Sequence, residues 1–92
     1  MGLPDDLKLA DWIKTCDYFQ WLCAYCQEIR IEVLEHFVPI THGGGTVVSN
    51  CVPACASCNQ KKMYVHPDKV RKIPRGDIER VRQYLATVKT VT

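Results

Sequence analysis

Two closely spaced cysteine pairs constrain the fold of this chain more than any other feature. Cys23 and Cys26 form the first pair, Cys55 and Cys58 form the second, and 28 residues separate them. Two residues between cysteines let both thiolates converge on one ion, and two such turns complete a tetrahedron. The interval exceeds the roughly 15–20 residues of simple zinc-ribbon patterns, so a hairpin must fit between the pairs.

Zinc is the metal that this pattern favours, because four thiolates leave no open coordination position and suit a structural role. An iron–sulfur cluster is the main alternative among metal groups. Disulfides are the other alternative, since the chain has six cysteines. However, the first residues carry acids where a secretory signal needs basic charge, and no long apolar run follows. We therefore expect a cytoplasmic protein without a membrane segment, in which Cys16 and Cys51 are small buried residues rather than ligands.

The length of 92 residues predicts a single domain over 1–92, near the lower limit for folding on hydrophobic burial alone. A zinc site of this kind contributes about 10–16 kcal/mol of apparent binding free energy to folding. That is comparable to the whole stability of an ordinary domain, about 5–15 kcal/mol. We expect an N-terminal helical part over 1–22, a zinc-bound core over 23–62 and a basic C-terminal segment with a helix over 63–92.

Local patterns predict a mixed α+β chain. Residues 4–20 are typical of a helix, because Pro4 and two acids suit a first turn and apolar residues follow at helical spacing. Residues 29–35 largely alternate apolar with polar side chains and predict a strand. A loop over 38–46 with a glycine run leads to a second short strand over 46–48, antiparallel to the first.

The remaining elements are helical. Residues from Ala54 to about Tyr64 predict a helix that starts near the second cysteine pair. A last helix is expected to begin near Asp77, with an apolar face at helical spacing. The members of that face are Ile78, Val81, Leu85 and Val88.

Four polar residues lie between and beside the cysteine pairs: Glu35, His36, Asn50 and Asn59. They belong to a longer string that resembles the HNH endonuclease family, and more narrowly its zinc-stapled branch with a ββα-metal core. The resemblance covers residues 23–62. The string reads Cys23-Ala-Tyr-Cys26, Glu35-His36-Phe-Val-Pro39, Gly43-Gly44-Gly45-Thr46 and Asn50-Cys-Val-Pro-Ala-Cys55-Ala-Ser-Cys58-Asn59-Gln-Lys-Lys62.

The resemblance implies a two-stranded hairpin packed on a helix, with a catalytic divalent ion where they meet. His36 would then be the general base that takes a proton from the attacking water, which suits an imidazole with a pKa near neutrality. Asn59 and Glu35 would bind the catalytic ion, and such oxygen ligands fit Mg²⁺ or Mn²⁺. Asn50 would tie down the loop and keep the His36 ring correctly turned.

Two positions depart from the commonest family pattern. Many members carry aspartate where this chain has Glu35, and the extra methylene moves the carboxylate relative to the expected metal position. Asn59 stands where other members have histidine, a variant that fits a hard-metal site. Both changes keep a group that can bind a cation. Taken singly, each of these residues is more commonly structural, and their joint spacing within the cysteine frame is what favours function.

The charge is distributed unevenly along the chain. Residues 1–59 hold three Lys/Arg against seven Asp/Glu, whereas residues 60–92 hold nine against three. A basic C-terminal third indicates a polyanionic partner, most commonly nucleic acid, although a solvated basic surface is the alternative. We expect contacts with DNA phosphates, and little sequence specificity. The residues expected to make them are Lys61, Lys62, Lys69, Arg71, Lys72 and Arg75.

The sequence therefore predicts a metal-dependent DNA endonuclease with a structural zinc, acting as a monomer or a homodimer. The alternatives are a zinc-knuckle module that binds DNA or a partner without cutting, and a purely structural zinc domain. Whether the product is a nick or a double-strand break stays open, as does cleavage of RNA. The biological system that employs such a chain is equally open.

Overall fold

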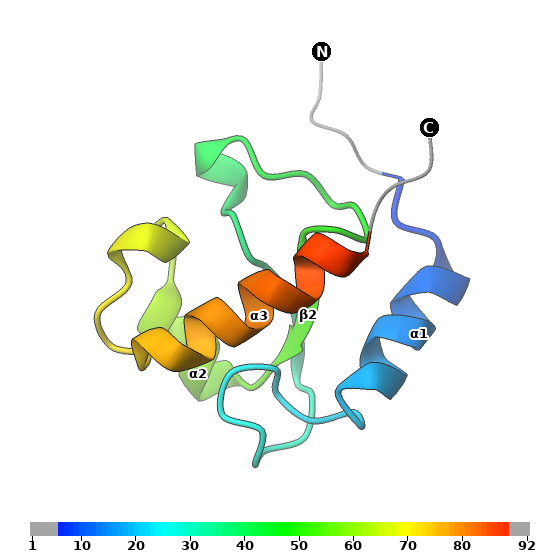
Figure 1. The fold of residues 1–92 in the computed structure, drawn as a ribbon, viewed down its shortest axis with the longest axis horizontal. Coiled ribbons are helices and arrows are strands. Elements are labelled where there is room, and N and C mark those ends of the chain that lie inside the picture. Colours follow the sequence, from blue (N-terminus) through cyan, green and yellow to red (C-terminus); the bar gives the residue numbers. More distant parts are fainter. Residues whose placement is uncertain (1–5, 89–92) are drawn as a thin grey trace.

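The computed structural model describes residues 6–88, and it shows the predicted α+β arrangement (Figure 1). A helix precedes a two-stranded hairpin, and two further helices follow it. The elements are α1 (Leu9–Tyr18), β1 (Val33–His36), the 3-10 turn η1 (Ile40–His42), β2 (Cys51–Ala54), α2 (Ala56–Lys62), the 3-10 turn η2 (Pro67–Lys69) and α3 (Arg75–Thr87). The predicted helix start at Pro4 lies outside the described residues.

The hairpin is antiparallel, as predicted, but both strands are displaced from their predicted positions. Val33 pairs with Ala54 and His36 with Cys51. The first strand starts later than residue 29 because the backbone before it closes the first cysteine turn, where Cys23 N donates to Ile29 O at 2.7 Å. The predicted strand over 46–48 is wrong. Residues 47–50 instead form a turn, in which Asn50 N donates to Val47 O at 2.9 Å.

The second strand contains Pro53, a residue that usually argues against a strand. Within the described residues the sheet has two strands, so each strand has an edge without a strand partner. The Pro53 carbonyl points away from β1 and accepts from Ala24 N at 2.8 Å. The first cysteine turn is thereby fastened to the outer edge of β2.

The core lies between the hairpin and the helices, and α3 crosses the hairpin in Figure 1. Ile78, Val81 and Leu85 of α3 are buried, as the helical spacing predicts. The predicted apolar face of α1 is only partly right, since Leu9 is 73% exposed while Cys16 is fully buried. Among residues 6–88, no helix is long and apolar enough to cross a membrane.

Candidate metal centre and active site

The four cysteines of the two pairs form one cluster. Cys23, Cys26, Cys55 and Cys58 place their Sγ atoms within 4.8 Å of one another. A tetrahedral zinc ion with Zn–S bonds of about 2.3 Å needs sulfur atoms about 3.8 Å apart, so the cluster fits zinc with a small contraction. Three of the four side chains are buried, which suits a closed structural site. The predicted convergence of the two pairs is confirmed, and Cys16 and Cys51 are not members of this cluster.

Backbone amides support the thiolates. Cys58 N donates to Cys55 Sγ at 3.4 Å, so the first turn of α2 begins at a sulfur of the cysteine cluster. Burial raises the pKa of Cys23 and of Cys58 above that of an ordinary thiol. At Cys26 burial acts in the same direction, but backbone N–H groups, those of Glu28 and Ile29 first, outweigh it and lower the pKa. Zinc binding must therefore displace protons from the buried thiols.

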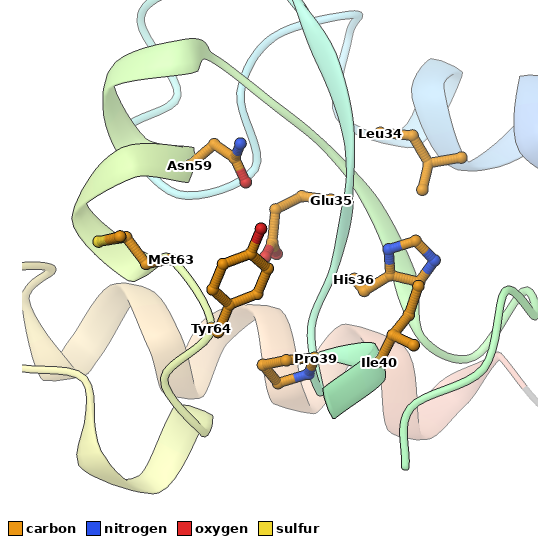
Figure 2. Close-up of a pocket in the computed structure, with 8 residues that line it drawn as sticks. All are labelled: Leu34, Glu35, His36, Pro39, Ile40, Asn59, Met63 and Tyr64. Carbon is orange, nitrogen blue, oxygen red and sulfur yellow. The ribbon is translucent and has the colours of Figure 1, made fainter. Parts of the chain in front are cut away.

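Three of the four predicted catalytic residues, all but Asn50, line a second site, a pocket of ≈ 110 Å³ between β1, η1 and the end of α2. Glu35, His36 and Asn59 all line it. In Figure 2 Glu35 and Asn59 lie on one side of the β1 ribbon and the imidazole of His36 on the other, as the alternation along a strand requires. Apolar side chains complete the wall: Leu34, Pro39, Ile40, Met63 and Tyr64.

His36 is the last residue of β1, and its ring is oriented by the loop that follows. His36 Nε2 lies 2.9 Å from Thr46 Oγ1. Because a hydroxyl can either donate or accept, Thr46 can hold the imidazole in both of its protonation states. Thr46 follows the glycine run, and sequence reasoning assigned it no role.

Asn50 fastens the same loop to the strand end. Its Oδ1 accepts from Val38 N at 2.8 Å, and its Nδ2 donates to Val38 O at 3.0 Å and to Gly45 O at 2.9 Å. Gly44 lies so close that an added Cβ would meet Val38 O at 1.8 Å and Asn50 Nδ2 at 2.8 Å. Asn50 thus holds the loop that carries Thr46.

Glu35 is buried between two donors. It is 4% exposed, its Oε2 accepts from the Tyr25 hydroxyl at 2.5 Å, and its Oε1 accepts from Lys62 Nζ at 3.0 Å. Burial raises the pKa of the Glu35 carboxyl, while the Lys62 ammonium and the Tyr25 hydroxyl act against that rise. Both carboxylate oxygens are therefore engaged by protein groups.

Lys62 requires a correction. It was expected to face DNA, but it is fully buried, pairs with Glu35 and also donates to His36 O at 3.1 Å. A buried ammonium in an ion pair has no surface to offer to a phosphate. Lys62 was predicted to be exposed because it follows another lysine, Lys61. Its ion-pair partner, Glu35, lies 27 residues earlier in the sequence.

The other predicted DNA contacts lie outside the core. Lys61, Lys69, Arg71 and Lys72 are exposed. Arg75 is also exposed, but its guanidinium donates to the carbonyls of Pro67, Asp68 and Val70 at 2.8–3.3 Å, so it holds η2 in place.

Tyr25, which contacts Glu35, is a second residue that sequence reasoning missed, after Thr46. It lies between Cys23 and Cys26 in the sequence and is 1% exposed. Its pKa is raised well above the ordinary value by burial and by the nearby Glu35 carboxylate. A tyrosine between two closely spaced cysteines gives a usable signal, because a buried hydroxyl needs a hydrogen-bond partner. The sequence does not say which residue that partner is.

Comparison with known proteins identifies the central part of the chain. Residues 23–64 match the HNH endonuclease family. The chain is 36% identical over 65 residues to a protein of Bacillus subtilis (strain 168) named "SPbeta prophage-derived putative HNH endonuclease YoqL". The alignment covers 58% of this chain and 28% of that relative, so the chain spans less than a third of the relative's length. No solved structure matches the chain significantly.

Proposed function

We propose that this chain, whose residues 23–64 belong to the HNH endonuclease family, is a metal-dependent endonuclease that hydrolyses phosphodiester bonds in DNA. One observation supports it above the others: His36 and Asn59, from β1 and α2, line the same pocket, which lies outside the cysteine cluster. Phosphodiester hydrolysis needs a base and a group that binds a cation, and this pocket is lined by one of each; a module that only binds nucleic acid needs no such base.

In this proposal the four cysteines hold a structural zinc, and the pocket holds Mg²⁺ or Mn²⁺. The amide oxygen of Asn59 is the protein ligand that the pocket offers most directly. Glu35 can serve as a second ligand only if one of its hydrogen bonds to Tyr25 or Lys62 is exchanged. A bound divalent ion would neutralise the scissile phosphate and stabilise the departing 3′ oxygen.

The chain's own residues do the remaining work. The imidazole of His36 takes a proton from the attacking water, and Thr46 keeps the ring in place before and after the transfer. Asn50 holds the loop that carries Thr46. The exposed Lys61, Lys69, Arg71 and Lys72 would position the DNA through its phosphates. One pocket allows one cut per binding event, so a double-strand break would need a homodimer or a second visit by a monomer.

Plasmid cleavage tests the proposal. Zinc-loaded protein is incubated with supercoiled DNA and Mg²⁺ or Mn²⁺, and wild type is compared with His36→Ala and His66→Ala. We expect nicked or linear DNA from wild type and from His66→Ala, whose partly exposed ring lies outside the pocket. We expect loss of cleavage from His36→Ala, by about 100-fold or more, as for removal of a general base.

The result also separates the proposal from its alternative, a zinc-knuckle module that binds without cutting. Wild-type protein that retards DNA in a gel but leaves it supercoiled with both metals would establish the binding module instead. Equal cutting by wild type and His36→Ala would leave an endonuclease but remove His36 as its base.

A further inference from the structure

The Tyr25 hydroxyl joins the turn of residues 23–26, which we call the zinc turn, to β1. This strand carries His36, the proposed base. The hydroxyl donates to Glu35 Oε2 at 2.5 Å in the interior of the molecule. Glu35 immediately precedes His36 in β1. The hydrogen bond therefore connects the cysteine cluster to the pocket through two side chains.

The zinc-turn end of this connection has little freedom. Arg80 of α3 donates from Nη2 to Ala24 O at 2.7 Å and to Tyr25 O at 2.9 Å. Ala24 N donates to Pro53 O in β2 at 2.8 Å. The backbone of Tyr25 is thus held by α3 and β2, in addition to the two cysteines that flank it.

The β1 end is equally constrained. Lys62 Nζ donates to Glu35 Oε1 at 3.0 Å and to His36 O at 3.1 Å. Both the side chain before His36 and the carbonyl of His36 itself are therefore fixed by buried donors. Together with Thr46 at Nε2, these bonds leave the imidazole few alternative positions.

We propose that Tyr25 is a positioning residue, whose hydroxyl transmits the geometry of the zinc turn through Glu35 to His36. This inference rests on the proposed function for its effect on cleavage, but its effect on the His36 ring is independent of it. It assigns the structural zinc an influence on the reaction without any contact with the reacting atoms. Loss of the hydroxyl should let β1 relax at Glu35 and turn the His36 imidazole away from its working position.

The test is Tyr25→Phe in zinc-loaded protein, which keeps the ring and removes the hydroxyl. Tyr84→Phe is the matched control, because the Tyr84 ring packs on Tyr18 and Phe19 rather than against Glu35. The first readout is the NMR signal of the His36 ring, identified by its absence in His36→Ala. Zinc content and the melting temperature show that each variant is folded.

We expect Tyr25→Phe to shift or broaden the His36 signal and to leave His42 and His66 unchanged. With Mn²⁺ we expect kcat to fall about 10- to 100-fold, the cost of a small misplacement of a reacting group, at an unchanged KM for DNA. The Mn²⁺ affinity measured by calorimetric titration should not fall, because the variant removes no proposed metal ligand. Tyr84→Phe should match wild type in every readout.

A wild-type His36 signal in folded Tyr25→Phe overturns the inference, and so does a wild-type kcat in an active enzyme. If wild-type protein cuts no DNA, the proposed function fails while the NMR comparison still decides this inference. If Tyr25→Phe does not fold, Arg80→Gln replaces it, since it loosens the backbone of the zinc turn and keeps the hydroxyl. An unchanged His36 signal in Arg80→Gln would then overturn the inference, and a shifted or broadened His36 signal would support it.

Discussion

Replacing Lys62 by methionine is the sharpest test of the buried ion pair. The side chains of Lys62 and Glu35 are 0% and 3% exposed, and 3.0 Å separates Nζ from Oε1. Methionine fills a similar volume but leaves the Glu35 carboxylate, and the carbonyl of His36, without this donor. Removing one partner of a buried pair costs about 3–5 kcal/mol, since the other charge stays buried without compensation.

The expected loss is large for a chain of this size. For a domain of 60–100 residues, each 1 kcal/mol lowers the melting temperature by about 4–8 °C, so we expect a fall of at least about 12 °C. Urea unfolding of the zinc-loaded protein measures the free energy directly. The double variant Glu35→Gln with Lys62→Met should recover most of the lost free energy of unfolding. Its neutral amide can still accept from Tyr25, and no buried charge is left.

The pH dependence gives a second measure of the same pair. Burial raises the pKa of Glu35, and the Lys62 ammonium acts against this rise. In Lys62→Met the pKa of Glu35 should therefore be higher than in wild type. A carboxyl whose pKa is raised in the folded state stabilises the fold while it is protonated and loses that stability as the pH rises through the raised pKa. Lys62→Met should therefore be less destabilised at pH 5 than at pH 8, and the double variant should lack this difference. A loss below about 1 kcal/mol, the range of exposed ion pairs, would refute the reasoning.

Three further predictions follow from the zinc cluster, the glycine loop and the basic surface. Removing zinc with a strong chelator should abolish the helical circular dichroism signal, whereas omitting only Mg²⁺ or Mn²⁺ should leave a folded, inactive protein. Gly44→Ala should cost about 1–3 kcal/mol or more in urea unfolding because its Cβ would overlap Val38 O, while Gly76→Ala, with nothing within 4 Å, should not destabilise. Lys69→Gln and Arg71→Gln should each reduce the log–log salt slope of DNA binding by about 0.9 if each contacts one phosphate.

Local sequence signals predicted the cysteine cluster and the buried face of the last helix well. The spacing of Cys23, Cys26, Cys55 and Cys58 carries its own geometry, so their convergence could be predicted without knowing the rest of the fold. The same holds for the buried face of α3, whose side chains follow the helical period. These features depend on neighbours within a turn or two of the chain.

The second strand and the Lys62 environment could not be predicted in this way. Residues 46–48 have the β-branched composition of a strand, and Pro53 argues against one, yet pairing with β1 places the strand at Cys51–Ala54. Lys62 follows another lysine and reads as solvent-facing, while its burial depends on Glu35 in a different element. Both outcomes are decided by contacts between distant segments, for which a single sequence holds no local signal.

The two ends of the turn η1 lie close together, and this affects where residues can be inserted into the chain. Pro39 O accepts from both His42 N at 2.8 Å and Gly44 N at 3.0 Å, so the chain leaves and returns at nearly the same point. The bonds of Asn50 to Val38 and Gly45 lie on either side of this excursion. We therefore expect that residues inserted between Ile40 and Gly43 would leave His36 and Thr46 in place. Because Ile40 lines the pocket, such an insertion would alter which substrates reach it and leave the proposed chemistry intact.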